Sequence, residues 1–190
     1  MRRVTKTEKR KAGLTILITG LPASGKSTLA RALYKVLSSA APGPVVLLDG
    51  DVVRKHLSSD LGFSREDRET NLRRVGLAAR RVAEKGGIAI CSFIAPYERS
   101  RREFRQLISR YGAYLEVYLS TPLEVCQRRD PKGLYARARR GYIKNFTGVD
   151  DPYEVPRNPE ITIDTANMNP EEAVRKILAY LDRQGYLKDF

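Results

Sequence analysis

The feature that most constrains the fold is a glycine-rich segment near the start of the sequence. Residues 20–27 read GLPASGKS, which fits the pattern GxxxxGK[ST], and Thr28 follows. An apolar, β-branched run over residues 14–19 precedes the segment, and apolar positions with helical spacing follow it. In this context the glycines let successive backbone N–H groups point at a phosphate, and the positive end of the helix dipole points to the same place. The segment therefore predicts a phosphate-binding loop.

This loop predicts a nucleotide, bound together with Mg²⁺. We expect Lys26 to reach the β- and γ-phosphates and the Ser27 hydroxyl to ligate Mg²⁺. The residues expected to contact the nucleotide are Gly20, Leu21, Pro22, Ala23, Ser24, Gly25, Lys26, Ser27 and Thr28. Small-molecule kinases, GTPases, ATPases and nucleic-acid motors share the pattern. A chain of 190 residues leaves little room for motor or effector domains, which favours a small kinase.

Short apolar runs alternate with helical stretches along the rest of the chain. Strands are expected at residues 14–19, 45–48, 88–93, 114–119 and 161–164. Helices are expected after the loop up to a turn at 41–44, and at about 65–85, 97–110 and 170–184. Such alternation is typical of a parallel sheet covered by helices on both faces. We predict a three-layer α/β fold with about five parallel strands.

The same pattern indicates the domain organisation. We assign residues 13–190 to a single domain, because no linker or internal repeat divides them. Residues 127–150 are basic and interrupted by Pro and Gly, which favours a mobile helical lid rather than core. Residues 1–12 form a separate basic arm.

The charge balance indicates an anionic partner. The chain has 35 Lys and Arg against 22 Asp and Glu, a net charge of +13, which suits nucleic acid, a membrane surface or a phosphorylated small molecule. Residues 1–12 carry +5, while residues 64–111 carry +6 and residues 112–148 carry +4. An RNA-binding tail would explain the first block of charge but not the two in the middle.

Bulk features also bear on location. No apolar run approaches the length of a membrane span, about 18 residues, and the N-terminus lacks the apolar region of a signal peptide. Cys91 and Cys126 cannot form a disulfide framework, and no cluster of Cys and His suggests a structural metal. We therefore expect a cytoplasmic protein with no membrane partner.

Two acidic residues follow the second expected strand. Asp49 and Asp51 would lie at the carboxyl end of that strand, where open α/β sheets place their active sites. Two carboxylates there can serve Mg²⁺ and a substrate hydroxyl. The alternative is that an Asp at this point only caps a helix.

Five segments resemble the adenylylsulfate kinase family. They are DGDVVR (49–54), LGFSREDRETNLRRVG (61–76), SFIAPYERSRR (92–102), RDPKGLYARAR (129–139) and IKNFTGVDDPYEVP (143–156). The resemblance extends almost continuously over residues 14–183. It implies transfer of the γ-phosphoryl group of MgATP to the 3′-hydroxyl of adenosine 5′-phosphosulfate (APS), which gives 3′-phosphoadenosine 5′-phosphosulfate (PAPS) and ADP. It also implies a homodimer.

The resemblance implies a set of substrate-binding residues. The matching positions are Asp51, Arg54, Phe63, Arg68, Asn71, Ile94, Ala95, Pro96, Lys132, Gly133, Leu134 and Phe146. Arg54, Arg68 and Asn71 would hold the phosphosulfate and ribose, since a guanidinium fork suits oxyanions. Phe63 and Phe146 would sandwich the adenine.

Further roles follow from the same resemblance. Residues 94–96 would form the wall beside the adenine, and residues 132–134 would close over both substrates. Lys26, Asp49 and Asp51 form the expected catalytic set. Asp49 would reach Mg²⁺ and Asp51 would orient the 3′-hydroxyl, although the sequence leaves this division of tasks open.

One position departs from the family. Many members have a serine, proposed to carry a phosphoryl group, where this chain has Ala95. A phosphoserine intermediate at this position is excluded, which favours direct in-line transfer from ATP.

Several other residues have structural interpretations. We expect His56 to be an exposed helical residue and Cys91 to be a buried small apolar group. Tyr135 and Tyr153 are expected to be packing residues. Most of the arginines at positions 99, 101, 102, 105 and 110 are expected to be solvated or structural.

Two rival functions remain at this point. One is a kinase of the same fold that acts on gluconate, shikimate or a nucleoside, and such an enzyme would not need two facing phenylalanines beside three anion-binding side chains. The other is a phosphate-loop protein that binds RNA or DNA through its positive charge, which predicts steeply salt-dependent binding.

Overall fold

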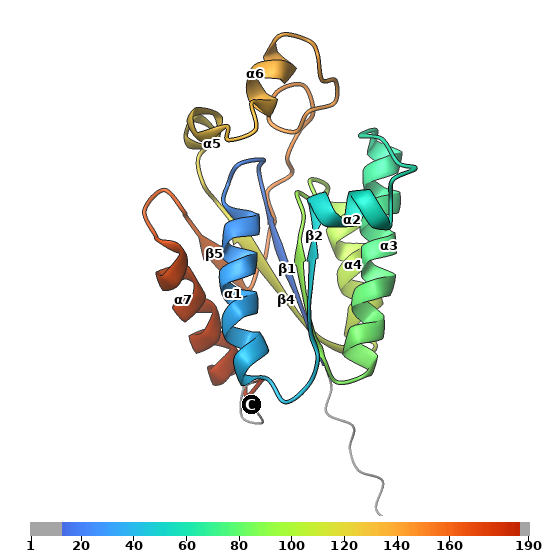
Figure 1. The fold of residues 1–190 in the computed structure, drawn as a ribbon, viewed down its shortest axis with the longest axis vertical. Coiled ribbons are helices and arrows are strands. Elements are labelled where there is room, and N and C mark those ends of the chain that lie inside the picture. The colour runs from blue at the N-terminus through green and yellow to red at the C-terminus, as the bar shows by residue number, and fades with distance from the viewer. Residues whose placement is uncertain (1–12, 187–190) are drawn as a thin grey trace, which may run out of the picture.

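The computed structural model describes residues 13–186, so the predicted basic arm at residues 1–12 lies outside the described residues. A five-stranded parallel sheet in the order β2-β3-β1-β4-β5 forms the centre (Figure 1). The strands are β1 (Gly13–Gly20), β2 (Val45–Asp49), β3 (Ile88–Ser92), β4 (Gly112–Leu119) and β5 (Ile161–Ile163). The predicted parallel α/β sheet is confirmed.

Helices cover both faces of this sheet (Figure 1). They are α1 (Lys26–Ala40), α2 (Gly50–His56), α3 (Arg65–Glu84), α4 (Glu98–Ser109), α5 (Leu123–Arg129), α6 (Leu134–Arg139) and α7 (Pro170–Arg183). Of these, α1 and α7 pack on one face, and α3 and α4 pack on the other. The sequence did not predict α2 as a separate helix.

Successive side chains of each strand point to opposite faces of the sheet, and this divides the hydrophobic core into two parts. Ile16 and Ile18 of β1 face the α1 and α7 side, while Leu17 faces the α3 and α4 side. All eight residues of β1 are buried, because this strand has a neighbour on each edge and helices on each face.

A third, smaller core lies beyond the carboxyl ends of the strands, in the segment that contains α5 and α6 (Figure 1). Its buried side chains are Cys126, Tyr135, Ala138 and Phe146. The Tyr135 hydroxyl donates a hydrogen bond to the Pro22 carbonyl, with a distance of 3.1 Å. The segment is helical as predicted and has a small core of its own, and its movement as a lid stays a prediction.

No helix within residues 13–186 is long and apolar enough to cross a membrane. His56 is the exposed last residue of α2, Cys91 is buried in β3, and Tyr135 is buried, as expected.

Candidate active site

The glycine-rich loop connects β1 to α1 at the carboxyl edge of the sheet. Ala23 and Gly25 have left-handed backbone conformations, with φ of 60° and 93°. Gly20 is enclosed, since a Cβ there would lie 2.9 Å from the Leu119 carbonyl oxygen. Helix α1 begins with no side-chain cap and with no acidic residue in its first turn. Its first backbone N–H groups are therefore free to bind an anion.

Lys26 is folded back on its own loop. Its ammonium donates to the Leu21 carbonyl oxygen at 2.6 Å and to Ser24 Oγ at 3.4 Å. Burial lowers the pKa of Lys26 to about 8, although the negative charges of Asp49 and Asp51 act in the opposite direction. A buried cation with only neutral direct partners is well suited to receive a phosphate.

Asp49 combines two roles. Its Oδ1 accepts a hydrogen bond from the Asp51 N–H at 3.2 Å, so Asp49 caps α2, as in the alternative considered from sequence. Its Oδ2 is buried and has no hydrogen-bond partner in the described part of the chain. The hydroxyl of Ser92, the register partner of Asp49 on β3, is buried without a partner as well. Asp49 therefore caps α2 with one carboxylate oxygen and has the other available for a ligand.

The free Asp49 oxygen fits a magnesium site. Magnesium in phosphoryl-transfer enzymes is bound by one or two protein ligands together with waters and substrate phosphates. The residues from 13 to 186 contain no group of three His, Cys, Asp or Glu that could hold a metal without such help. Ser27, partly exposed in the first turn of α1, is the second expected ligand.

Asp51 is exposed at the start of α2. Its Oδ2 accepts a hydrogen bond from Lys132 Nζ in the segment between α5 and α6. The structure thus brings together the acid expected to orient the acceptor hydroxyl and a lysine expected to close over the substrates. Gly133 has a left-handed φ of 63° and precedes Leu134, the first residue of α6.

Two arginines flank Phe63. The Arg54 guanidinium carbon lies 4.4 Å from the centroid of the Phe63 ring, and that of Arg68 lies 5.8 Å from it. Burial lowers the pKa of both guanidinium groups, and the positive charge of Arg68 adds to this effect on Arg54. Within the described residues neither arginine forms an ion pair, which is the arrangement expected of a site that binds an anion.

Arg68 also connects two distant segments. Its Nε donates to the Phe63 carbonyl oxygen at 3.0 Å, and its Nη2 donates to the Asn145 carbonyl oxygen at 2.7 Å. Asn71 lies one helical turn further along α3, is buried, and has an Oδ1 with no partner among residues 13–186. Arg68 and Asn71 therefore share the face of α3 that borders the site.

The two phenylalanines have different surroundings. Phe63 is 53% exposed, whereas Phe146 is buried and packs edge-on against Tyr135, with ring centroids 5.1 Å apart. Asn145, which precedes Phe146, is held by Arg68, so both rings belong to segments bound to the same guanidinium. The adenine sandwich remains a prediction.

The comparisons with known proteins identify the family. A profile described as adenylylsulphate kinase matches residues 12–164. An adenylyl-sulfate kinase of Halothermothrix orenii is 45% identical over 179 residues, which is 94% of this chain and 95% of that protein. The chain belongs to the adenylylsulfate kinase family.

Solved structures agree with this assignment. The adenylylsulfate (APS) kinase of Mycobacterium tuberculosis, in complex with AMPPNP and APS, is 38% identical, with a TM-score of 0.86 over 90% of this chain and 98% of that one. A gluconokinase of Sinorhizobium meliloti shares only the fold, at 19% identity over 96% of this chain and all of that one, with a TM-score of 0.62. A sulfate adenylyltransferase of Aspergillus oryzae is 45% identical over 174 residues, which is 92% of this chain and 30% of that protein.

Ala95, in the predicted substrate wall, has an unusual backbone conformation. Ala95 has a left-handed φ of 44° and lies in the loop after β3. Its carbonyl oxygen accepts a hydrogen bond from Arg101 Nη1 at 2.7 Å. The neighbouring Ile94 carbonyl accepts one from Thr19 Oγ1 at 2.6 Å, and Thr19 Oγ1 lies 2.9 Å from the Tyr153 hydroxyl. Side chains from β1, α4 and the loop after α6 thus fix the predicted substrate wall.

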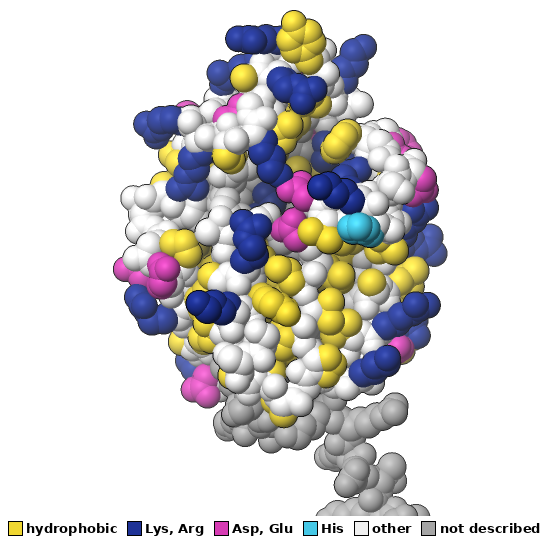
Figure 2. All heavy atoms as spheres, viewed as in Figure 1, with side chains coloured by type: hydrophobic (Ala, Val, Ile, Leu, Met, Phe, Trp, Pro, Cys, Tyr) yellow, Lys and Arg dark blue, Asp and Glu magenta, His cyan; other side chains and the backbone are white. Residues whose placement is uncertain are grey.

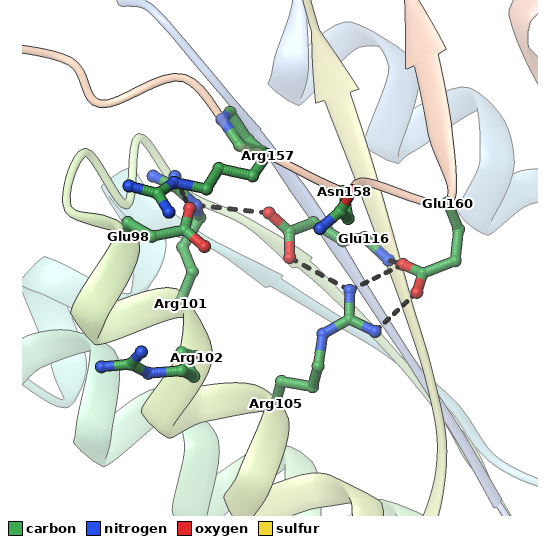
Figure 3. Close-up of a pocket in the computed structure, with 9 residues that line it drawn as sticks. Glu98, Arg101, Arg102, Arg105, Glu116, Arg157, Asn158 and Glu160 are labelled. Atoms are coloured by element: carbon green, nitrogen blue, oxygen red, sulfur yellow. Dashed lines mark hydrogen bonds and ion pairs between the residues drawn. The ribbon is translucent and has the colours of Figure 1, made fainter.

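Arg101 is part of a network that lines a cavity of about 330 Å³ (Figure 3). Arg101 Nε lies 3.2 Å from Glu116 Oε1, and Arg105 forms ion pairs with both Glu116 and Glu160. Figure 3 shows both arginines directed from α4 toward Glu116 on β4. Carboxylates therefore neutralise both of these arginines in the lining of the cavity. These ion pairs agree with the expectation that most of the arginines on this helix are solvated or structural.

Part of the surface charge lies over the segment of α5 and α6. Figure 2 shows Lys and Arg side chains over this segment and also along both sides of the face below it, with acidic side chains among them. The positive charge on this face is therefore mixed with negative charge and does not form one continuous stripe.

Proposed function

We propose that this chain transfers the γ-phosphoryl group of MgATP to the 3′-hydroxyl of APS, giving PAPS and ADP. The observation that carries the proposal is the Phe63 ring with the guanidinium carbons of Arg54 and Arg68 at 4.4 and 5.8 Å from its centroid, where Arg54 belongs to the helix that begins at the carboxyl end of β2. An aromatic face and two guanidinium groups without carboxylate partners suit a ligand that combines a purine with an oxyanion. Gluconate and shikimate do not contain a purine.

Catalysis rests on positioning and charge neutralisation. Lys26 leaves the Leu21 carbonyl and binds the β- and γ-phosphates, with the N–H groups at the start of α1. Asp49 and Ser27 would hold Mg²⁺, which when bound would supply positive charge for the transferring group. Asp51 accepts a hydrogen bond from the 3′-hydroxyl and orients it, while Lys132 exchanges its contact with Asp51 for the substrates.

The acceptor is tested by coupled ATP turnover. With APS as acceptor, ADP release should far exceed that with gluconate, shikimate or adenosine at equal concentration. If APS gave no more ADP than gluconate or adenosine, the proposal would be wrong. The nucleic-acid alternative is tested by filter binding of long RNA and DNA over a range of salt, where we expect no salt-dependent retention.

We expect Phe63→Ala to weaken APS binding. Stacking of a base on an aromatic side chain contributes about 1–3 kcal/mol, so the KM for APS should rise about fivefold to 150-fold. The KM for ATP should not change, because Phe63 lies on the α2 and α3 side of the site. Steady-state kinetics with each substrate varied in turn measure both values.

The matched control is Tyr142→Ala. Tyr142 is an aromatic residue that is even more exposed, at 72%, and it has no assigned role. Equal effects of the two substitutions on the KM for APS would show that Phe63 does not contact the base.

We also infer that transfer is direct, because Ala95 has no hydroxyl to accept a phosphoryl group. A single in-line displacement inverts the configuration at phosphorus, whereas transfer through a phosphoenzyme retains it. ATP made chiral at the γ-phosphorus should therefore give PAPS with inverted configuration. The Ala95→Ser variant should also invert, since the rest of the loop is unchanged. Retention by the unaltered protein would contradict direct transfer.

We infer that the protein is a homodimer. Figure 2 shows hydrophobic side chains gathered over the face of α1, β2 and α2, and the exposed apolar residues there include Tyr34, Val36 and Val52. Strand β2 is an edge of the sheet with four partly exposed apolar residues, which is a surface that association would cover. Light scattering that gave the mass of one chain at micromolar concentration would overturn this inference.

We infer a cytoplasmic location. Cys91 and Cys126 are both free and buried, as is usual in a reducing compartment. Cell fractionation that found the protein outside the cytoplasm would contradict this.

A further inference from the structure

The carbonyl group of Ser24, in the phosphate-binding loop, is held by residues far away in the sequence. Its oxygen accepts a hydrogen bond from Thr165 Oγ1 at 2.9 Å, and Thr121 Oγ1 lies 3.4 Å from the same oxygen. Thr165 follows β5 and Thr121 follows β4, so both hydroxyls approach the loop from the strand ends on one side of β1. Among residues 13–186, the other side chain that forms a hydrogen bond with Ser24 is Lys26, whose ammonium donates to Ser24 Oγ at 3.4 Å.

Thr165 also packs against the next loop residue. A Cβ placed on Gly25 would lie 3.5 Å from Thr165 Oγ1 and 3.6 Å from Thr165 Cγ2. Gly25 precedes Lys26 and has the left-handed φ that starts α1. Thr165 therefore contacts both residues that set the direction in which the backbone N–H groups of the loop point.

The Thr165 hydroxyl is itself polarised by a cation. Arg129, the last residue of α5, donates from Nη1 to Thr165 Oγ1 at 2.7 Å and from Nη2 to the Thr165 carbonyl oxygen at 2.6 Å. With its single proton on Ser24, Thr165 Oγ1 accepts from Arg129 and, at 2.9 Å, from Thr121 Oγ1. Hydrogen bonds in such a chain strengthen one another, and one to a charged donor is stronger than a neutral one.

We propose that Thr165 is a positioning residue that holds the phosphate-binding loop in its nucleotide-binding shape and, through Arg129, couples the loop to the lid segment. The coupling is physical, because Arg129 leads directly into the segment that carries Lys132, whose ammonium contacts Asp51. Closure of this segment over the nucleotide and the shape of the loop are therefore linked. This inference rests on the proposed function only in taking a nucleoside triphosphate as the ligand of the loop.

The test is nucleotide binding in the absence of APS. Thr165→Val removes the hydroxyl and keeps the shape, and it should raise the Kd for MgADP, measured by calorimetry, about tenfold. Thr165→Ser keeps the hydroxyl and should return the Kd to within about twofold of the unaltered protein. The matched control is Thr162→Val, on the exposed face of β5, which should leave the Kd unchanged.

A second variant tests the coupling. Arg129→Ala should weaken MgADP binding by a similar factor, and the double variant Thr165→Val/Arg129→Ala should bind no worse than the weaker single variant, because both act through one chain of contacts. Arg129 is exposed, so its removal tests the proposal even if Thr165→Val fails to fold. Losses that multiply in the double variant would overturn the coupling.

Other outcomes would overturn the role of Thr165. An unchanged Kd for MgADP in a folded Thr165→Val variant would do so, and so would a Thr165→Ser variant that binds as poorly as Thr165→Val. A wrong acceptor assignment would leave all of these binding results intact, so failure of the proposed function and failure of this inference can be told apart.

Discussion

Replacement of Lys26 by methionine should reduce the rate of phosphoryl transfer to APS by about a thousandfold or more. The loss of one preorganised donor to developing charge typically costs about 10²–10³ in rate, and Lys26 supplies a full positive charge. Methionine keeps the apolar stem in the buried position that Lys26 occupies. Measured by coupled ADP release, the kcat should fall, while the Kd for APS changes little.

The stability of this variant separates a chemical effect from misfolding. In the unliganded protein the Lys26 ammonium is buried, and burial lowers its pKa from 10.5 to about 8. A basic group whose pKa is lower in the folded protein than in the unfolded protein destabilises the fold at pH values below its pKa in the folded state. It no longer does so at pH values above its pKa in the unfolded state. At pH 7 the methionine variant should therefore be at least as stable as the unaltered protein, and this advantage should shrink as the pH rises from about 8 to above 10.5.

Chemical denaturation across this pH range measures the difference. Lys26→Arg is a control that keeps the charge. A methionine variant that retains more than a tenth of the activity would show that Lys26 does not act on the transferring group.

Replacement of Arg101 by alanine should be the most destabilising single change in the protein. Arg101 is 1% exposed, and its removal leaves the buried Glu116 carboxylate without its nearest cation. Breaking a buried ion pair on one side costs about 3–5 kcal/mol. The carbonyl groups of Ala95 and Glu154 also lose their hydrogen-bond donor. The decrease in the free energy of unfolding should therefore lie within or above that range.

The pH dependence of the Arg101→Ala variant gives a further check. Burial raises the pKa of Glu116, and Arg101 and Arg105 oppose this effect. Without Arg101 the pKa rises further, and a protonated Glu116 needs no cation. The loss of stability should therefore be smaller at pH 5 than at pH 8, in urea unfolding at each pH.

Two controls accompany this measurement. Arg99→Ala removes an exposed arginine from the same helix, paired with Glu103, and should cause no measurable change. The double variant Arg101→Met/Glu116→Leu replaces the pair by apolar side chains and should regain much of the lost stability. An Arg101→Ala variant as stable as Arg99→Ala would contradict the structural role of the network.

The parts of the fold that depend on local pattern could be predicted from the sequence. Apolar runs of strand length and the glycine-rich loop are local signals, and they predicted the parallel sheet and its nucleotide edge correctly. Helix α2 was missed because its seven residues carry no helical period of their own and begin at the Asp49 cap.

Contacts between distant segments could not be predicted in the same way. Thr165 and Ser24 are 141 residues apart, and Arg68 and Asn145 are 77 residues apart, so no local spacing signals either pair. Arg101 is a different case. It precedes Phe104 and Ile108 by three and seven residues, which places it on the buried face of α4, and this spacing could have distinguished it from its exposed neighbours.

The central position of β1 has a consequence for biosynthesis. Leu14 pairs with Ile88 on one side, and Gly13 pairs with Gly112 on the other. At a synthesis rate of about 5–20 residues per second, the first strand waits about 5–20 seconds for its last partner to leave the ribosome. Until β4 is made, only the β3 edge of this strand, which the finished protein buries completely, has a partner available. Its other edge is an unpaired strand edge during that time, which is the kind of edge that can pair with another chain.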